Sequence, residues 1–330
     1  MMDTNRRKFL AALTALAAAS ARPVTAQPSQ AQSWPTKPVR MIVPFAAGGN
    51  TDGIARLIGQ RLAEALGQQF VVENRAGANG MIAAETVARA APDGYTLFLA
   101  ALPQIAVFPA MTKASYDPVK DFAPISNIGV NPFVLMVHPS FPVTTVGEFV
   151  ARARAQPNMI AYGSGGHGSL SHMTMALFLK RAGIEMNHVP YKGGGPAMAD
   201  TVAGHVPSYF GNLSEALPFA ANAQIRMLGV SSTARARQIP QVPTILESGY
   251  PGFNVITWNG LLAPAGTAKT IIDRLAKECA AAVKDPAVVQ RFAGYGVDPL
   301  GDGPAEFAAT IAADIPVWAE AVRITGVALQ

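Results

Sequence analysis

The chain has 330 residues, of which 50% are hydrophobic and 14% are charged. This composition excludes a disordered chain, because disordered segments are poor in apolar residues and rich in charge. The length suggests roughly two domains. Cys279 is the single cysteine of the sequence, so neither an intrachain disulfide nor a thiolate metal cluster is possible.

Residues 1–26 have the organisation of an export signal. A basic cluster (6–8) precedes an apolar run from Phe9 to Ala19, and small residues lead to Ala26. The string RRKFL is similar to the twin-arginine signal. A transmembrane anchor is the alternative, but the apolar run is well short of the ~20 residues that a bilayer requires. We therefore predict cleavage near Ala26 after export of the twin-arginine type, with general secretion as the other possible route.

The basic character of the sequence belongs largely to this signal. Cleavage removes four basic residues and one acidic residue from totals of 26 and 21, which leaves a net charge of +2. The mature chain has no stripe of Lys and Arg, so we expect no nucleic-acid partner.

The mature chain alternates between buried strands and amphipathic helices. After a tether at 27–38, we predict strands at 39–45, 69–73 and 96–100, a helix that Thr51 or Asp52 caps and Gly67 ends, and a helix at 80–91. A second set has strands at 133–137, 159–163, 188–191, 207–211 and 226–230, and helices at 144–156, 169–182 and 196–203. A strand at 254–263 and helices at 268–283, 286–293 and 304–323 follow. This alternation predicts an α/β fold with mostly parallel sheets.

The strand at 254–263 determines the predicted domain organisation. It follows a complete α/β set, yet only helices and one short strand come after it, and these cannot form a third domain. We therefore expect the chain to return to its first domain, with a hinge where it crosses near 130–134 and near 250–255. The predicted lobes are 27–132 with 253–330, and 133–252.

Two glycine-rich loops connect a strand to a helix, PFAAGGNTD (44–52) and YGSGGHGSLSH (162–172). The first N–H groups of a helix have no intrahelical partner and lie at the positive end of the dipole, so such a loop forms an anion site. Neither loop contains Lys or Arg, so a carboxylate would be bound by backbone N–H groups and by the hydroxyls of Thr51, Ser164 and Ser169. The alternative is that the glycines only form tight turns. KGGG (192–195) is a third turn of this kind.

The second loop also fits the dinucleotide fingerprint G-x-G-x-x-G. Its glycines are Gly163, Gly165 and Gly168, and Glu185 lies 22 residues beyond the first of them. An exported nicotinamide or flavin oxidoreductase is therefore the alternative function. The short strand before the loop, the position in the middle of the chain and the lack of an evident catalytic pair argue against it.

The histidines do not form a recognisable metal motif. They are His138, His167, His172, His188 and His205. His167 and His172 are five residues apart, whereas a helical zinc pair requires a spacing of four. The five are few and scattered, so we expect no metal ion.

Seven stretches together carry a family resemblance over essentially the whole mature chain. They are WPTKPVRMIVPFAAGGNTDGIARLIGQRLAEALGQQFVVENRAGANG (34–80), PDGYTLFLA (92–100), YDPVKDFAPIS (116–126), YGSGGHGSLSH (162–172), HVPYKGGGPAM (188–198), VPTILESGYPGF (242–253) and GLLAPAGT (260–267). In this order they strongly resemble the substrate-binding proteins of tripartite tricarboxylate transporters, the Bug (TctC-like) family. The resemblance implies the type II periplasmic-binding-protein (Venus-flytrap) fold, with two α/β lobes and a hinge. It implies neither catalysis nor a cofactor.

The resemblance also implies which residues bind the ligand. A carboxylate is held between the loop after the first strand and the matching loop of the second lobe. The implied ligand-binding residues are Phe45, Ala46, Ala47, Gly48, Gly49, Asn50, Thr51, Asp52, Ser164, Gly165, Gly166, His167, Gly168, Ser169, His172, Tyr191 and Asn212. Three positions depart from the family pattern, namely Ala47, His167 and Gly211. The last stands where an acidic residue is usual, which predicts that amino acids are not ligands.

The sequence therefore predicts a periplasmic receptor for a small organic acid, a mono- or dicarboxylate. It would close around its ligand by hinge motion and present the closed lobes to membrane transporter subunits or to a sensor. We expect a monomer.

Overall fold

The computed structural model describes residues 34–220 and 222–326. The predicted export signal lies outside these residues, as does most of the predicted tether. The chain divides into Met1–Thr36 and Lys37–Gln330, and every helix and strand of the described residues belongs to the second part.

The first α/β set confirms the predicted strands and helices to within a few residues. Its elements are β1 (Val39–Val43), α2 (Asn50–Leu66), β2 (Phe70–Asn74), α3 (Met81–Ala88), β3 (Thr96–Ala101) and α4 (Phe108–Met111). A 3-10 turn (Ala78–Gly80) precedes α3 and a π-helical turn (Pro103–Val107) precedes α4. We did not predict the last turn or α4.

Helix α2 shows how the local sequence sets its limits. Its apolar residues Ile54, Ile58 and Leu62 are fully buried, and it ends where Gly67 takes a left-handed conformation and donates its N–H to the carbonyl of Ala63. The prediction that Thr51 or Asp52 caps its start is wrong. The N-cap is Gly49, which has no side chain to accept from the first turn.

Strand β4 (Phe122–Val137) is much longer than the predicted strand at 133–137. Residues 122–132 contain Pro124, Gly129 and Pro132, which are residues that disfavour a strand. The strand accommodates Pro124 and Gly129 by two register shifts against β9 (Ile256–Pro264), at 124–126 and at 127–129. One continuous strand therefore replaces the predicted start of a new set.

The second set contains eight elements. They are α5 (Val146–Ala155), β5 (Ala161–Ser164), α6 (Leu170–Ala182), β6 (Asn187–Pro190), α7 (Gly194–Val202), β7 (Ser208–Asn212), α8 (Leu213–Ala220) and β8 (Arg226–Val230). Helix α8, which contains Pro218, was not predicted. The signal for it is a capping box. Asn212 Oδ1 accepts from the N–H of Ser214, and the Glu215 carboxylate accepts from the N–H of Asn212.

After β9 the chain returns to the first set. The remaining elements are α9 (Lys269–Ala282), α10 (Pro286–Gly294), β10 (Asp298–Pro299) and α11 (Pro304–Thr325). The strand order is β2-β1-β3-β9-β4-β7-β5-β6, with β8 and β10 also paired to β4.

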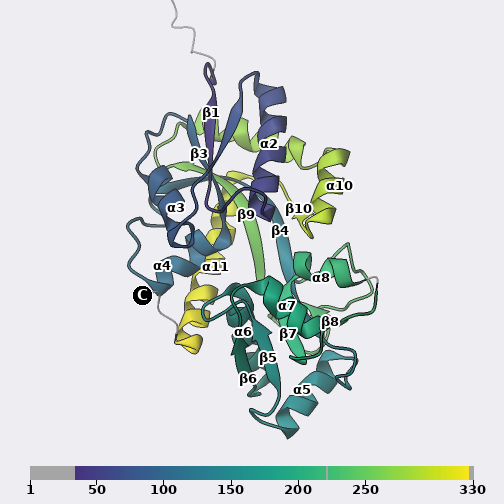
Figure 1. The fold of residues 1–330 in the computed structure, drawn as a ribbon. Helices are drawn as coiled ribbons and strands as arrows, with labels where there is room; N and C mark the ends of the chain where they lie inside the picture. Colours follow the sequence, from purple (N-terminus) through teal and green to yellow (C-terminus); the bar gives the residue numbers. More distant parts are fainter. Residues whose placement is uncertain (1–33, 221, 327–330) are drawn as a thin grey trace, which may run out of the picture. The chain divides into compact units, whose positions relative to one another are not determined.

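The sheet is mixed, so the expectation of mostly parallel sheets is wrong. The outer pairs β1–β2, β1–β3, β5–β6 and β5–β7 are parallel. The central pairs β3–β9, β4–β9 and β4–β7 are antiparallel. Figure 1 shows β4 and β9 side by side, linking the first group of strands to the second. We call β1–β3, β9, β10 and the start of β4 the first lobe, and β5–β8 with the end of β4 the second lobe.

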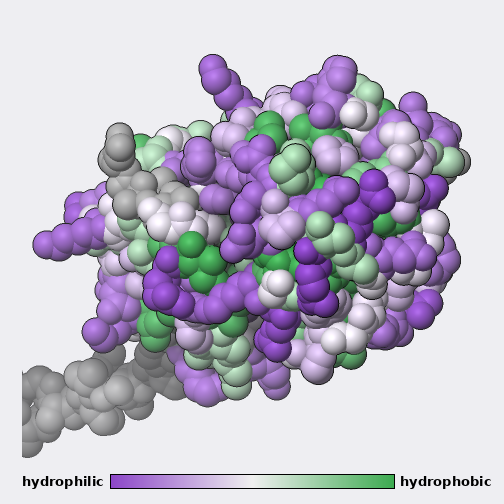
Figure 2. All heavy atoms as spheres, turned by 90° about the horizontal axis from the view of Figure 1, so that it is seen from below, coloured by the Kyte–Doolittle hydropathy of each residue, from purple (hydrophilic) through white to green (hydrophobic). Residues whose placement is uncertain are grey.

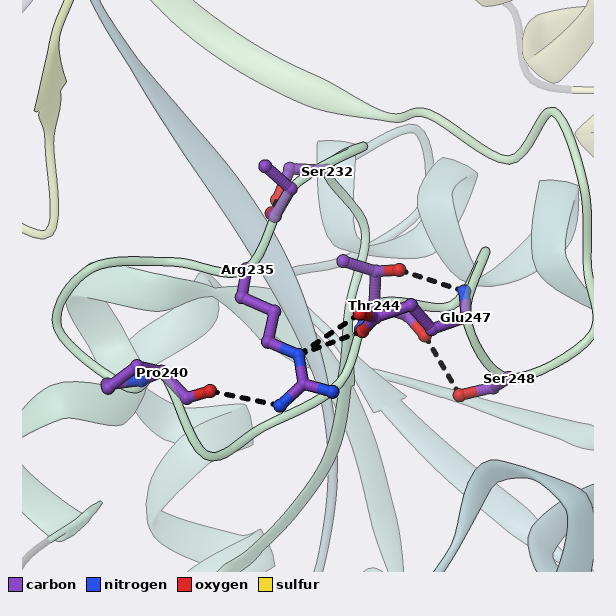
Figure 3. Close-up of polar contacts among 7 residues, drawn as sticks. Ser232, Arg235, Pro240, Thr244, Glu247 and Ser248 are labelled. Carbon is purple, nitrogen blue, oxygen red and sulfur yellow. Dashed lines mark hydrogen bonds and ion pairs between the residues drawn. The ribbon is translucent and has the colours of Figure 1, made fainter.

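The segment between β8 and β9 is held by a local polar network (Figure 3). The carboxylate of Glu247 accepts from the N–H of Thr244 at 2.7 Å, and the N–H of Glu247 donates to Thr244 Oγ1 at 2.9 Å. This reciprocal pair has the pattern of a capping box, here at the turn of residues 245–249. Arg235 donates to Glu247 at 3.0 Å and to the carbonyl of Pro240 at 3.2 Å. The network fixes the turn from which the chain returns to the first lobe.

Exposed large hydrophobic side chains come from several different elements. They are Val71, Ile82, Val119, Met159, Leu246, Leu300 and Val317. On the face in Figure 2, hydrophobic residues form small patches among hydrophilic ones. Within the described residues, no helix has the length and apolar character needed to cross a membrane.

A partly buried hydrogen bond between α11 and β9 makes a testable contribution to stability. Trp258 Nε1 donates to Asp314 at 2.7 Å, and burial raises the pKa of Asp314 to about 6. An acid whose pKa is raised by folding stabilises the fold at low pH. That stabilisation is lost as the pH rises through about 6.

We therefore expect Asp314→Asn, which keeps an acceptor for Trp258, to raise the free energy of unfolding by roughly 1–3 kcal/mol at pH 7.5. At about pH 4 the carboxyl is protonated and no gain is expected. Urea unfolding of both proteins at the two pH values measures this difference. An equal difference at both pH values would contradict the assignment.

Candidate functional site

The second lobe gathers three strand ends at one edge of its sheet. Strands β5, β6 and β7 are parallel and end at Ser164, Pro190 and Asn212. The glycine-rich loop (164–169), the turn at 191–193 and the start of α8 follow them directly. Ligands of α/β proteins bind at this edge, so the structure brings the predicted residues of the second lobe together.

The predicted residues of the first lobe lie between β1 and α2. Ala46, Ala47, Gly48 and Gly49 are exposed, Phe45 and Asn50 are half-buried, and Thr51 and Asp52 are buried. The first turn of α2 comes directly after the exposed residues of this loop.

The carboxylate of Asp52 holds the shape of this loop. It accepts from the N–H of Gly48 at 2.9 Å, from Arg56 at 3.0 Å and from Asn74 at 3.0 Å. Asn74 also donates to the carbonyl of Phe45 at 3.0 Å. Burial by itself would raise the pKa of Asp52, but the hydrogen bonds from Arg56, Gly48 and Asn74 lower it below its usual value. Asp52 therefore positions the loop by these three bonds.

The α2 first turn retains the properties of an anion site. Gly49 provides no side-chain cap, and a side chain at Gly48 would meet no atom within 4 Å. A cavity of about 340 Å³ beside the loop is lined by Gly48, Gly49, Asp52, Gly53, Arg56, Leu57, Gln60, Arg291 and Tyr295. Two of these residues are arginines, Arg56 of α2 and Arg291 of α10.

The hydroxyls of the second loop hold the loop itself. Ser164 Oγ accepts from the N–H of Gly166 at 3.0 Å and lies 2.6 Å from His188 Nε2. Ser169 is the N-cap of α6 and accepts from the N–H of His172 at 3.2 Å. We expected both hydroxyls to contact the anion, but in this structure they are engaged within the lobe.

The third glycine turn packs directly on the second loop. The N–H of Gly193 donates to the carbonyl of Gly165 at 3.1 Å. A Cβ at Gly165 would lie 3.3 Å from backbone atoms of Gly193 and Gly194. Helix α7 starts at Gly194, and its N-cap Gly193 has no side chain. The start of α7, including Gly195, therefore offers uncapped N–H groups beside the loop, which we did not assign to the site. The KGGG string after a strand was the available signal.

Three histidines form a cluster at this loop. The rings of His172 and His188 stack with centroids 3.9 Å apart and planes 3° apart. His167 lies edge-on to both, at 5.7 Å and 5.0 Å. The ligand nitrogens of all three lie within 4.8 Å of one another. The expectation that the histidines are scattered is wrong for these three, because sheet register places His188 opposite Tyr162, just before the loop.

The two stacked rings are neutral at pH 7. Burial, and then the neighbouring imidazoles, lowers the pKa of His172 and of His188 to about 4. The N–H of Gly168 donates to Nδ1 of His172 at 3.2 Å. His188 was not among the predicted site residues.

Two predicted residues use their polar atoms locally. Tyr191 donates its hydroxyl to Asp200 at 2.7 Å, and burial, with Asp200, raises the pKa of Tyr191 to about 12. The side-chain oxygen of Asn212 caps α8 through Ser214. Neither contact shows a ligand-binding role.

A buried carboxylate lies close to the end of β7. Glu215 accepts from the hydroxyl of Tyr209 at 2.8 Å and from the N–H of Asn212 at 3.0 Å. Burial raises the pKa of Glu215. A Cβ at Gly211 would lie 2.3 Å from the Tyr209 ring, so this ring explains why position 211 has no side chain. The acidic group at this end of the strand comes from Glu215.

The dinucleotide interpretation does not fit the fold. The fingerprint requires its acidic residue near the ribose, beyond the carboxyl end of the following strand. Glu185 instead precedes β6, at the edge opposite the glycine loop, and its carboxylate accepts from Asn158 at 2.7 Å. Sequence spacing alone matched the fingerprint.

Two α/β lobes joined by paired strands, with uncapped glycine starts of helices at strand ends, define a two-lobe solute-binding protein of the periplasmic type. The model of the tripartite tricarboxylate transporter family receptor, TctC, matches residues 54–325. The chain belongs to this family, whose members are substrate-binding receptors and not enzymes.

Similar proteins match along most of the chain. Protein BugT of Bordetella pertussis is 36% identical over 92% of this chain and 94% of its own length. The structure of Rpa4515 of R. palustris with adipate is 36% identical, with a TM-score of 0.74 over 89% of this chain and 99% of that chain. MatC from Rhodopseudomonas palustris with bound malate is 32% identical, with a TM-score of 0.71 over 88% of this chain and 100% of that chain.

The contact between the two glycine turns makes a prediction for Gly165→Val. The added side chain would push against Gly193 and Gly194 backbone atoms and displace the start of α7. We expect carboxylate affinity to fall by about ten-fold or more, which corresponds to about 1.4 kcal/mol, with an unchanged circular dichroism spectrum.

The matched control is Gly147→Val in α5, where a Cβ meets only Thr145 Oγ1 at 3.9 Å. Isothermal titration calorimetry of both variants measures the difference. Normal binding by Gly165→Val would show that the loop assignment is wrong.

Proposed function

We propose that this protein is an exported periplasmic receptor that captures a small organic acid with one or two carboxylates. The supporting observation is that α2 and α7 both start at glycines that leave their first-turn N–H groups without a side-chain cap. Adipate and malate, the ligands named for two relatives of similar fold, are both dicarboxylates.

In the proposed mechanism a carboxylate docks at the start of α2 and the second lobe then closes on it. We place the hinge in the paired stretch of β4 and β9. The lobe boundaries that the sequence suggests, 132/133 and 252/253, lie within or close to this stretch. Closure withdraws the anion from water into the protein interior. Hydrogen bonds from fixed N–H groups are stronger there than in water. The backbone N–H groups at the two helix starts are neutral donors, which suit reversible capture of an anion.

The partner of the closed form is a membrane protein, either the transporter subunits that give the family its name or a sensor. The predicted export signal with cleavage near Ala26 would place the receptor in the periplasm. The family supports the first proposal, and the N-terminal sequence supports the second.

A thermal-shift screen of the mature protein tests the proposed function. The protein is first unfolded and refolded to remove any bound ligand, and then mixed with adipate, malate, benzoate, amino acids or NAD(P). A ligand at ~100 times its Kd stabilises by about 2.7 kcal/mol, which raises the Tm by several degrees at ~2–4 °C per kcal/mol.

We expect a shift with at least one carboxylate and none with NAD(P). A shift with NAD(P) alone would overturn the proposal and support a dinucleotide site. A shift with an amino acid alone would contradict the specificity inferred from Gly211.

A further inference from the structure

The histidine cluster contains ligand nitrogens within reach of one another, but its geometry does not favour a metal ion. The lone pair of an imidazole lies in the plane of its ring, and a zinc ion lies about 2.0–2.1 Å along it. The rings of His172 and His188 are parallel and 3.9 Å apart, so their lone pairs run side by side and do not meet. One ring would have to leave the stack to share an ion.

The hydrogen bonds make His172 a donor. Its Nδ1 accepts from the N–H of Gly168, so the neutral ring carries its proton on Nε2. Its stacked neighbour His188 is held by Ser164 at 2.6 Å. The cluster therefore offers a neutral N–H group at the loop where we propose that a carboxylate binds.

The elements around the cluster provide no counter-charge. Strand β5 contributes the ring of Tyr162, stacked on His188 at 5.0 Å, and the next turn contributes the exposed Lys192. The acidic residues on neighbouring elements are hydrogen-bonded to other groups. Asp200 of α7 accepts from Tyr191 and contacts His205, and Glu215 of α8, which lies against Gly194, accepts from Tyr209. Among the described residues, no ion pair includes a ring of the cluster. His172 is buried and His188 is half-buried, whereas His167 is exposed. A proton on the stacked pair would be uncompensated while the site is empty.

We infer that His167, His172 and His188 form a proton-linked anion site, in which an arriving carboxylate draws a proton from solvent onto the cluster. This inference rests on the proposed function. The anion supplies the opposite charge that the empty site lacks, and so favours the imidazolium form. By linkage, the proton strengthens anion binding by the same factor. The proton is shared by coupled rings and belongs to the cluster as a whole.

The sign of the pH dependence follows. In the empty site the stacked rings of His172 and His188 stay neutral down to about pH 4, and a bound anion moves their titration toward the ordinary histidine value of about 6.5. Affinity therefore increases as the pH falls from 7.5 to 5.5, by about ten-fold. A site built only from backbone N–H groups would show no such increase.

Calorimetry in buffers of different ionisation enthalpy counts the protons directly. The probe is adipate, malate or benzoate, whichever raises the Tm most, titrated at pH 6 in phosphate and in a zwitterionic amine buffer. We expect the wild-type protein to take up about half a proton or more per anion. An uptake of zero, or a release, with binding intact would overturn the inference. Failure of every carboxylate to bind would instead overturn the proposed function, and the inference with it.

Two substitutions remove the titrating rings and keep their hydrogen bonds. In His172→Asn the side-chain oxygen still accepts from Gly168, and in His188→Gln the amide still reaches Ser164. We expect either to lower the proton uptake and to flatten the pH profile. Melting curves verify that each variant is folded. If a variant does not fold, the proton uptake of the wild-type protein alone decides the test.

The matched control is His138→Gln. His138 follows β4 and bonds to Ser140, at the end of the second-lobe sheet opposite the loop. The His138→Gln variant should take up as many protons per anion as the wild-type protein. A loss of proton uptake equal to that of the cluster variants would overturn the assignment. Binding that disappears with EDTA and returns with Zn²⁺ would assign the cluster to a metal and overturn the inference as well.

Discussion

The antiparallel pairing of β4 with β9 is the constraint on which the rest of the fold depends. β9 pairs with β3 of the first lobe along one edge and with β4 along the other. β4 then continues without interruption to pair with β7 and β8 of the second lobe. Because both strands belong to one hydrogen-bonded sheet, a change in the register of either would move the strand ends that hold the glycine loops.

The chemistry of the site follows from which helix starts are capped. Helix α6 satisfies its first turn with Ser169, and α8 does so with Asn212 and Glu215. Helices α2 and α7 begin after glycines and have no side-chain cap. An anion is the natural partner of such ends. The contrast therefore indicates that the loop before α2 and the turn before α7 are available to a ligand, whereas the Ser169 cap belongs to the loop before α6.

Local features were predictable from the sequence because local interactions determine them. Helix α2 has apolar residues at helical spacing and Gly67 at its end, and both features appear in the structure. The full length of β4 was not predictable in this way, since pairing with β9 outweighs the local effect of Pro124 and Gly129. Helix α8 has a capping box at Asn212 and Glu215 that the sequence contains but that we did not use.

Contacts of the site that depend on sheet pairing could not be read from spacing. His188 meets His172 only because β6 pairs with β5 in a register that brings His188 opposite Tyr162. The same limit applies to the packing of Gly165 on Gly193, which joins two loops from neighbouring strands. The dinucleotide fingerprint shows the converse, because a correct spacing places Glu185 at the wrong edge of the sheet.

The most direct test of the central claim is the crystal structure of the mature protein with its best-binding carboxylate. We expect the carboxylate oxygens to lie about 3 Å from backbone nitrogens of the first turn of α2, with the second lobe contributing the start of α7 and the histidine cluster. A carboxylate bound away from both uncapped helix starts would contradict the account.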